Sequence, residues 1–396
     1  MELFRFLTAG SVDDGKSTLI GHLLHLVKAL KADQISKITA LSEGDEVVNY
    51  AWFTDGLKSE RELGITIDVS YQYFSTAARR FIIADCPGHK EYTRNMFTGA
   101  STADLLVLMV NVENGITEQT RRHLKIGQLL QLPNILICIN KMDLVDYDEK
   151  AFNQLKSDFS EIINPAEANH FFIPVSATKG DNLAEKSDRM KWYEGATLLA
   201  VLNNAKKIDT TDDSPCFPVQ VVLNHENETH ILGNVFDGEL NTGDTLFISS
   251  SEKSATISKI YQANKHVNTI KPGEYGSLVI DTDYAIKRGD ILARKKADLQ
   301  ATKTIKAKCC WMDETSLQFD KSYILKLSTQ EVSCMIKSVI ESDKTNERVD
   351  LNTIFTAELE TEVALITKPY VESKTLGTFI VIDPTTNQTV AAGTIL

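Results

Sequence analysis

The stretch Gly10-Ser11-Val12-Asp13-Asp14-Gly15-Lys16-Ser17 decides the fold of this chain. It matches the pattern G-x-x-x-x-G-K-[ST] and stands between an apolar run, Phe4 to Leu7, and a segment with helical periodicity. In this setting glycines let backbone N–H groups curl round phosphates, and the helix N-terminus adds positive potential. The loop predicts a phosphate site with Lys16 at the β- and γ-phosphate oxygens and Ser17 on Mg²⁺. The residues expected to bind here are Gly10, Ser11, Val12, Asp13, Asp14, Gly15, Lys16, Ser17 and Thr18.

Apolar runs alternate with segments of helical periodicity up to about Lys206. Runs that are apolar on consecutive residues predict strands buried on both faces, and hence a parallel sheet between helices. The segment from Ser17 to Ala32 places its leucine, isoleucine and valine residues on one helical stripe, which predicts a helix. We therefore expect a doubly wound, mostly parallel α/β domain over residues 1–207. Its strands are expected at Phe4–Leu7, Phe81–Ile83, Leu105–Val112, Ile135–Ile139 and Phe171–Val175.

The pattern changes in the second half of the chain. The polar stretch Ile208–Pro215 ends in proline and predicts a linker. Beyond it, short alternating stretches such as Thr245–Ile248 and Phe379–Ile382 are separated by glycine-containing turns, which is typical of antiparallel barrels. A second polar stretch, Arg294–Gln300, divides this half into two modules. The sequence predicts three domains: residues 1–207, and antiparallel β-barrels at 216–297 and 301–396.

The composition narrows the class of protein. No apolar run in the 396 residues approaches the length of a membrane span, and the N-terminus lacks the features of a signal peptide. We therefore expect a cytoplasmic protein with no membrane partner. The net charge of −12 weighs against a long contact with a nucleic acid backbone. The six cysteines have no zinc-ligand spacing, which fits reduced thiols.

A second motif, Asp85-Cys86-Pro87-Gly88-His89, follows the apolar run Phe81 to Ala84. A carboxylate at the carboxyl end of a strand lies on the edge where open α/β sheets bind ligands. Asp85 is therefore expected to reach the Mg²⁺ shell, and the Gly88 N–H to meet the γ-phosphate. His89 could position the attacking water.

A third motif, Asn140-Lys141-Met142-Asp143, follows the run Ile135–Ile139 and selects the base. The Asp143 carboxylate can accept two hydrogen bonds from the N1–H and N2–H₂ edge of guanine, which adenine cannot supply. Asn140 can tie the base site to the phosphate loop, and the Lys141 stem can cover the base plane. After the last strand, Ser176-Ala177 is expected to supply a backbone N–H to guanine O6. Together these residues predict GTP rather than ATP as the ligand.

A threonine between the first two motifs completes the set. Thr66, in Gly64-Ile65-Thr66-Ile67, can join the Mg²⁺ shell when the γ-phosphate is present and release it after hydrolysis. The expected metal ligands are thus Ser17, Thr66 and Asp85, and the expected catalytic residues are His89, Thr66 and Lys16. His22 and His25 share a helix but have no acidic or thiol companions, so we interpret them as structural rather than metal-binding. Trp311 is expected in a barrel core.

These motifs, in this order, resemble those of the GTPase superfamily. Gly233–Asp244 looks like the first barrel of elongation factors, which indicates the translation-factor branch. Asp14 separates the chain from elongation factor Tu, which looks to have histidine there. Within this branch the chain is similar to the large-subunit family of bacterial sulfate adenylyltransferase. The similar stretches are Gly10–Thr18, Glu60–Val69, His89–Ser101, Asp143–Tyr147, Gly180–Asn182, Lys191–Gly195 and Thr197–Leu199.

The resemblance implies a mechanism and a partner. A GTPase of this family binds GTP or GDP with Mg²⁺ and forms a heterodimer with a small catalytic subunit. GTP hydrolysis drives the synthesis of adenosine 5′-phosphosulfate from ATP and sulfate, a reaction of sulfate assimilation, and the site for ATP and sulfate is expected on the partner. In relatives, an apolar pair matched here by Val12 and Ile65 screens the histidine from water until activation.

Two departures and two alternatives remain open at this point. Leu223–Gly233 lacks the Arg-Gly pattern of the family, and the chain ends without the adenylylsulfate kinase extension of some relatives. Asp383–Leu396 nevertheless has the pattern of a complete final strand pair. One alternative is an elongation-factor-like GTPase that binds aminoacyl-tRNA, although the second half shows scattered lysines without an evident basic stripe. The other is a GTP-controlled scaffold in a specialised sulfation pathway.

Overall fold

The computed structural model describes residues 2–30, 50–53, 68–89, 93–100, 102–164, 166, 168–207, 214–225, 228–251, 253–263, 265–342 and 348–396. The chain divides into two compact units, Met1–Ile208 and Asp209–Leu396. In the described ranges, no helix combines the length and the apolar character needed to cross a membrane.

The first unit is built on a six-stranded sheet in the order β2-β3-β1-β4-β5-β6. Every neighbouring pair is parallel except β2 and β3, which are antiparallel. Every residue of β4 and β5 is buried, as the continuous apolar runs predict. The strands are β1 (Glu2–Ala9), β2 (Ser70–Ser75), β3 (Arg79–Asp85), β4 (Leu105–Asn111), β5 (Asn134–Asn140) and β6 (Asn169–Pro174).

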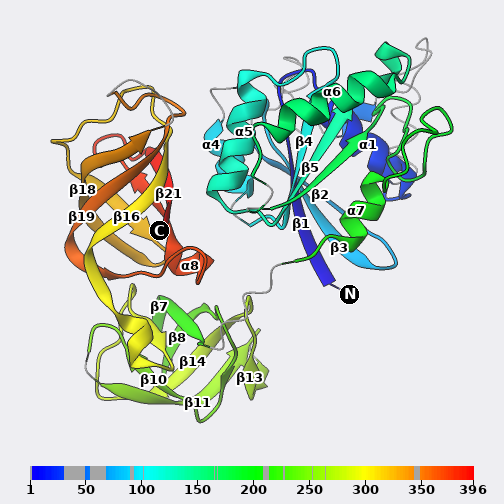
Figure 1. Ribbon diagram of the computed structural model, residues 1–396. Coiled ribbons are helices and arrows are strands. Elements are labelled where there is room, and N and C mark those ends of the chain that lie inside the picture. Colours follow the sequence, from blue (N-terminus) through cyan, green and yellow to red (C-terminus); the bar gives the residue numbers. More distant parts are fainter. Residues whose placement is uncertain are drawn as a thin grey trace. The chain divides into compact units, whose positions relative to one another are not determined.

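Helices cover both faces of this sheet, which confirms the doubly wound prediction (Figure 1). On one face, α1 (Lys16–Leu26) and α7 (Leu198–Asn204) pack leucine and isoleucine side chains on the core of the sheet. On the other face lie α4 (Thr93–Ala100) and α5 (Glu118–Leu129). A further helix, α6 (Glu149–Ser160), packs Phe159 against the Phe172 ring of β6, with ring centroids 6.0 Å apart.

Two local features differ from the sequence prediction. Helix α1 ends at Leu26 instead of continuing along the apolar stripe, and Lys28 takes a left-handed φ of 56°, which breaks the helix. Strand β2 was not predicted, because only one of its six side chains is buried and its sequence, Ser-Tyr-Gln-Tyr-Phe-Ser, lacks a continuous apolar run.

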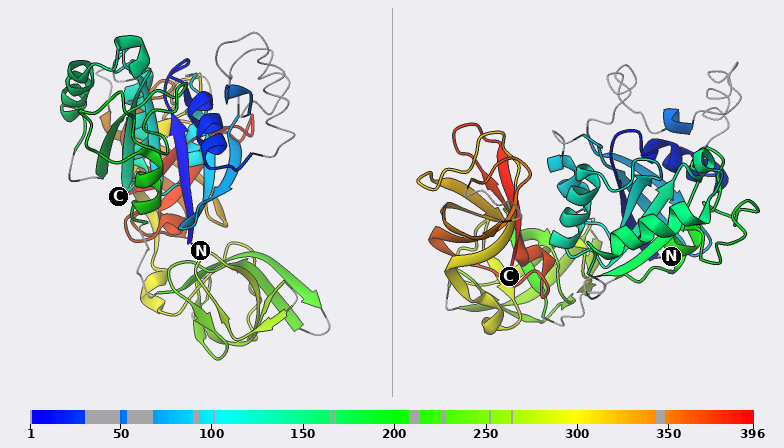
Figure 2. Two further views of the ribbon diagram at one scale, coloured as in Figure 1. Left: turned by 90° about the vertical axis from the view of Figure 1, so that its right-hand side faces the viewer. Right: turned by 45° about the horizontal axis from the view of Figure 1, so that its top comes forward.

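The second unit begins with a seven-stranded antiparallel sheet in the order β10-β15-β7-β8-β14-β11-β12. An additional pairing of β10 with β11 makes this sheet curl round on itself (Figure 2). A short pair, β9 (Leu240–Asn241) with β13 (Thr269–Ile270), accompanies it. The strands of the sheet are β7 (Cys216–His225), β8 (Glu228–Asn234), β10 (Thr245–Ile248), β11 (Ser254–Gln262), β12 (Lys265–Val267), β14 (Tyr275–Asp281) and β15 (Ile291–Ala293).

A closed barrel of six strands follows, in the order β16-β19-β18-β17-β20-β21. Trp311 is 2% exposed within its core, which confirms the sequence interpretation of this residue. Cys216 and Ile291 of the preceding sheet pack into the same core cluster, and Ser373 Oγ donates to Asp237 Oδ2 at 2.6 Å. The strands are β16 (Ala301–Trp311), β17 (Tyr323–Leu327), β18 (Gln330–Ser342), β19 (Ile354–Ile366), β20 (Thr378–Ile382) and β21 (Thr389–Ile395), with α8 (Lys374–Gly377) before β20.

The antiparallel character of the second half is thus confirmed. Its division into two separately folding domains, at the boundaries given above, stays a prediction. All six cysteines are free and buried, which accounts for them as small core residues.

Candidate nucleotide-binding site

The predicted motifs meet because the strands that precede them are parallel. Strands β1, β3 and β5 end at Ala9, Asp85 and Asn140, and the loop Ser176–Ala177 follows β6. The carboxyl ends of parallel strands share one edge of a sheet, where ligands bind in open α/β folds. Sequence segments far apart in the chain therefore line one site.

The phosphate loop begins directly after β1 and ends at the N-terminus of α1. Gly15 precedes the first helical residue with φ 93°, a left-handed conformation that glycine adopts without strain. A Cβ on Gly15 would collide with the side-chain amide of Asn140, and a Cβ on Gly10 would lie 2.7 Å from Met109 O. The loop therefore needs glycine at both positions to fit between β4 and the base-binding motif.

Lys16 is 7% exposed and lies folded against its own loop. Its Nζ donates to Gly10 O at 3.0 Å and to Ser11 O at 2.7 Å. Burial lowers the pKa of Lys16 below its ordinary value, and the negative charges of Asp85 and Asp14 act in the opposite direction. The ammonium is thus presented in a site of low polarity, where its attraction to phosphate oxygens is strong.

Asp14 and Ser11 stabilise the curl of the loop. The Ser11 N–H donates to Asp14 Oδ2 at 2.7 Å, and the Ser11 hydroxyl lies 2.7 Å from the hydroxyl of Thr117, the residue that caps α5. Asp14 is 1% exposed, and this burial raises its pKa, while the bond from Ser11 lowers it. Asp14 thus supports the loop from behind instead of lining the cavity.

The second motif contacts the phosphate loop at the end of β3. Asp85 is buried and its Oδ1 accepts a hydrogen bond of 2.8 Å from the Thr8 hydroxyl on β1. A Cβ on Gly88 would lie 2.7 Å from Lys16 Nζ and 2.9 Å from the Val12 N, so only glycine permits this approach. Cys86 and Pro87 are buried between these two residues.

Asn140 connects the base side of the site to the phosphate side. Its Nδ2 donates to Asp14 O at 2.7 Å, as expected, and its Oδ1 accepts from the Ala177 N–H at 2.9 Å. The Ala177 N–H is therefore engaged with Asn140 in this structure, whereas the sequence predicts that Ser176-Ala177 supplies a backbone N–H to guanine O6. Met142 is buried and its N–H donates to Val175 O at 3.2 Å, which fixes the turn to the end of β6.

These segments enclose a cavity of about 610 Å³, a size typical of ligand pockets. Asn140, Lys141 and Asp143 line its base side. Three lining residues were not predicted: Ala51 from the 3₁₀-helix η1 (Tyr50–Phe53), and Leu144 and Thr178, each one residue beyond a predicted motif. The remaining lining residues are Val12, Asp13, Gly15, Lys16, Ser17, Thr18, Gly88, His89 and Ala177.

Several predicted residues do not line the cavity. They are Gly10, Ser11, Asp14, Asp85, Cys86, Pro87, Met142 and Ser176. Thr66 and Ile65 lie outside the described residues, so the structure does not place them.

The residues present fit a guanine nucleotide. Asp143 lines the base side of the cavity, and a carboxylate there can accept hydrogen bonds from the N1–H and N2–H₂ edge of guanine. The glycine cradle beside Lys16 suits phosphates. The Ser17 hydroxyl and the Asp85 carboxylate are hard oxygen donors, which Mg²⁺ prefers.

Comparison with known proteins agrees with this geometry. Residues 1–222 match the family model of the elongation factor Tu GTP binding domain, and residues 304–396 match the model described as GTP-eEF1A C-terminal domain-like. Among solved structures, the Saccharomyces cerevisiae Ski7 GTPase-like domain bound to GTP covers 100% of the chain and 97% of its own, with a TM-score of 0.55 and 18% identity. That likeness establishes the fold.

The curated relatives are closer in sequence. Sulfate adenylyltransferase subunit 1 of Saccharophagus degradans is 38% identical over 100% of this chain and 87% of its own length. The protein of the same name from Yersinia enterocolitica is 39% identical, covering 99% and 85%. The bifunctional enzyme CysN/CysC of Mycobacterium tuberculosis is 39% identical over 100% of this chain and 67% of its own. The chain therefore belongs to the family of sulfate adenylyltransferase subunit 1, within the elongation factor Tu type of GTP-binding proteins.

Proposed function

We propose that this chain is the GTPase subunit of a sulfate adenylyltransferase. It binds GTP with Mg²⁺ and hydrolyses it, and this hydrolysis drives the formation of adenosine 5′-phosphosulfate and diphosphate from ATP and sulfate on a separate small catalytic subunit. The observation that carries the proposal is the identity of 38% along the whole chain to a relative named as subunit 1 of that enzyme.

The base side of the cavity supports the division of labour between two subunits. The G-x-x-x-x-G-K-[ST] pattern occurs once in the sequence, and the cavity beside it presents the Asp143 carboxylate, which suits guanine and not adenine. ATP is therefore expected on the partner. A heterodimer with the small subunit follows as part of the same proposal.

In the nucleotide complex, Lys16 contacts the β- and γ-phosphate oxygens in place of its bonds to Gly10 O and Ser11 O. Ser17 and Asp85 would hold Mg²⁺, together with Thr66, and the metal neutralises the charge that develops on the transferred phosphoryl group. Thr66 is the residue expected to couple the presence of the γ-phosphate to the conformation of the surface that the partner contacts.

His89 is the residue proposed to orient the attacking water. It lines the cavity one residue beyond Gly88, which itself lies against Lys16. Val12 also lines the cavity and is 38% exposed, and it is the described member of the proposed apolar screen. A water held by His89 would attack the γ-phosphorus on the side away from the β-phosphate oxygen of the leaving GDP.

The experiment is GTP hydrolysis measured with the small subunit present. His89→Ala should slow hydrolysis by on the order of 100-fold and leave GTP affinity nearly intact, since orienting water is a transition-state role. His266→Ala, at an exposed histidine on β12, is the matched control and should hydrolyse GTP at the wild-type rate. Equal rates of GTP hydrolysis in the two variants would show that a group other than His89 orients the attacking water.

A second arm tests the coupling to the partner. Thr66→Ala should separate GTP hydrolysis from adenosine 5′-phosphosulfate synthesis more than it weakens GTP binding. Tight, GTP-dependent binding of aminoacyl-tRNA, with no effect of the small subunit on hydrolysis, would favour the elongation-factor alternative and reject the proposal.

A further inference from the structure

The turn that carries Asp143 has an unusual backbone. Lys141 has φ 64°, Asp146 has φ 49° and Tyr147 has φ 58°, so three non-glycine residues within seven positions are left-handed. For a bulky side chain such as tyrosine this conformation is strained, and it persists only when surrounding contacts determine it. The contacts that hold Tyr147 therefore hold the shape of the turn.

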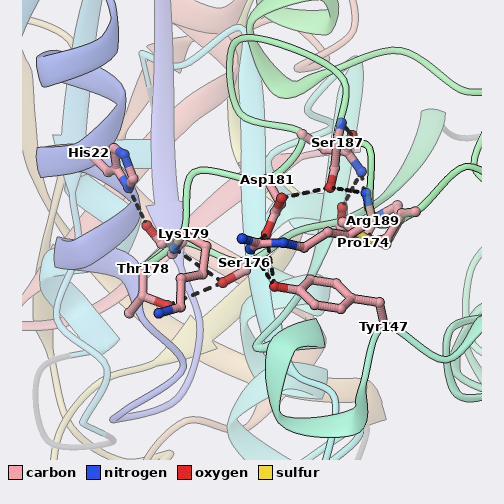
Figure 3. A network of polar contacts seen from close by, with 12 residues as sticks. His22, Tyr147, Pro174, Ser176, Thr178, Lys179, Asp181, Ser187 and Arg189 are labelled. Carbon is pink, nitrogen blue, oxygen red and sulfur yellow. Dashed lines mark hydrogen bonds and ion pairs between the residues drawn. The ribbon is translucent and has the colours of Figure 1, made fainter. Parts of the chain in front are cut away.

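Tyr147 is fixed at its backbone and at its hydroxyl. Its N–H donates to Met142 O at 2.8 Å, and its carbonyl oxygen accepts a bond of 3.0 Å from the indole N–H of Trp192. Its hydroxyl donates to Asp181 Oδ2 at 3.1 Å and accepts from Arg189 Nη1 at 2.9 Å (Figure 3). Burial raises the pKa of Tyr147, which keeps the hydroxyl protonated as a donor.

Asp181 belongs to the loop that carries Ala177. It forms an antiparallel bridge with Ser176, and its Oδ1 accepts a bond of 2.6 Å from the Ser187 hydroxyl. Arg189 Nη1 also reaches Asp181 Oδ2 at 3.3 Å, so Arg189, Tyr147 and Asp181 form a closed set of three contacts, seen together in Figure 3. The Asp181 side chain is 11% exposed, whereas the Arg189 side chain is 54% exposed, so Asp181 and Tyr147 form the more buried part of this set.

The same loop is held to the rest of the unit on its other side. His22 on α1 lies with Nδ1 2.7 Å from Ala177 O, and since a carbonyl can only accept, Nδ1 carries the proton. Asn182, which follows Asp181, donates to Pro174 O at 2.8 Å at the end of β6. The Ala177 loop is thus a fixed platform, to which Tyr147 connects the turn of Asp143.

We propose that Tyr147 is a positioning residue for base recognition: it fastens the Asp143 turn to the Ala177 loop through Asp181 and Trp192, and so sets the guanine specificity of the site. This inference rests on the proposed guanine site and names residues outside the predicted motifs. Tyr147 does not line the cavity, so it acts by holding Asp143 where its carboxylate meets both N1–H and N2–H₂.

The readout is the ratio of affinities for GTP and inosine triphosphate, which lacks the 2-amino group. Tyr147→Phe keeps the ring and removes the bond to Asp181, and Trp192→Phe keeps an aromatic ring and removes the bond to Tyr147 O. Each variant should lower the GTP-to-inosine-triphosphate ratio by about fivefold, the effect of one hydrogen bond of ordinary strength.

Tyr284→Phe in the second unit is the matched control, since the Tyr284 hydroxyl also donates to a single residue, with Ser250 O and Oγ each 3.1 Å away. It should leave the ratio unchanged. A merely structural role for Tyr147 would lower the melting temperature and not the ratio. An unchanged ratio in both Tyr147→Phe and Trp192→Phe overturns the inference.

Asp143→Asn distinguishes an error in the positioning role of Tyr147 from an error in the guanine-site assignment itself. If Asp143→Asn lowers the ratio and Tyr147→Phe does not, only the positioning role is wrong. If Asp143→Asn leaves the ratio unchanged, the guanine assignment is wrong and the inference is overturned with it.

Discussion

The side-chain amide of Asn140 donates a hydrogen bond of 2.7 Å to the main-chain oxygen of Asp14, 126 residues earlier in the chain. Through this bond and the one from the Ala177 N–H, Asn140 joins the phosphate loop, the Asp143 turn and the Ala177 loop. Phosphate and base binding are therefore expected to depend on each other.

Asn140→Ala should weaken GTP binding by on the order of 30-fold, because it leaves Asp14 O and the Ala177 N–H unpaired in a buried setting. Isothermal titration with GTP and Mg²⁺ measures the change. Asn134→Ala is the matched control at the opposite end of β5: Asn134 is also buried and donates to Asp104 O and Lys206 O. It should lower stability and leave GTP affinity intact; an equal loss of affinity would show that general destabilisation explains the effect.

Lys16→Ala should weaken nucleotide binding on the order of 100-fold or more, because two charge-assisted bonds to phosphate are lost. The same titration tests it, with Lys150→Ala, an exposed lysine on α6, as the control. Unchanged affinity in Lys16→Ala would remove the phosphate-loop assignment.

Asp143→Asn should weaken GTP on the order of 100-fold and favour xanthosine triphosphate. In the proposed site the carboxylate would accept two bonds from guanine, each worth about 1.5–3 kcal/mol, whereas an amide presents a donor that suits the C2 carbonyl of xanthine. Asp146→Asn, at an exposed position in the same turn, is the control and should keep the preference for GTP. If Asp143→Asn binds GTP in preference to xanthosine triphosphate by the same affinity ratio as the wild type, the base site lies elsewhere.

The stability of the first unit should depend on pH through His123. This histidine is fully buried on α5, with Nε2 2.8 Å from Gln119 Nε2, and burial together with the charges of Lys16 and Arg122 lowers its pKa to about 3. It is neutral when folded, whereas the unfolded chain takes up a proton below pH about 6.5. Its contribution is therefore fully present above pH about 6.5 and is lost as the pH falls toward 3.

Denaturant unfolding of wild type and His123→Gln between pH 7.5 and 5 measures this dependence. The wild-type free energy of unfolding should fall with a limiting slope from His123 of about 1.4 kcal/mol per pH unit below pH 6.5, and the variant should lose that part of the slope. Identical slopes would show that His123 is not neutral in the folded state. His22, whose pKa burial also lowers, retains its own contribution in both proteins.

The sequence predicted those parts of the molecule that are governed by local patterns. Continuous apolar runs predicted β1, β3, β4, β5 and β6. A strand that is buried on both faces is apolar at consecutive residues, so it is visible in the sequence. The sequence also predicted that the motifs after these strands form one site, because the carboxyl ends of parallel strands lie at one edge of the sheet. Strand β2 was missed because it lies at the edge of the sheet and keeps most of its side chains out of the core.

The unpredicted parts of the site depend on contacts between distant segments. Ala51 reaches the cavity because η1 packs on α1, where a Cβ on Gly21 would collide with Tyr50 O. The bonds from Tyr147 and Arg189 to Asp181 join residues 34 and 8 positions apart, and no periodicity encodes them. Sequence patterns indicate which groups do chemistry; the residues that position those groups emerge only from the tertiary structure.

The most direct test of the proposed function is the synthesis of adenosine 5′-phosphosulfate from ATP and sulfate by this chain alone, by the cognate small subunit alone, and by both. Each mixture is supplied with GTP or with a non-hydrolysable GTP analogue. We predict no product from this chain alone, synthesis when both are combined with GTP, loss of that synthesis with the analogue, and faster GTP hydrolysis in the complex. Product formed by this chain without the small subunit, or synthesis by the complex that is indifferent to GTP hydrolysis, would contradict the account.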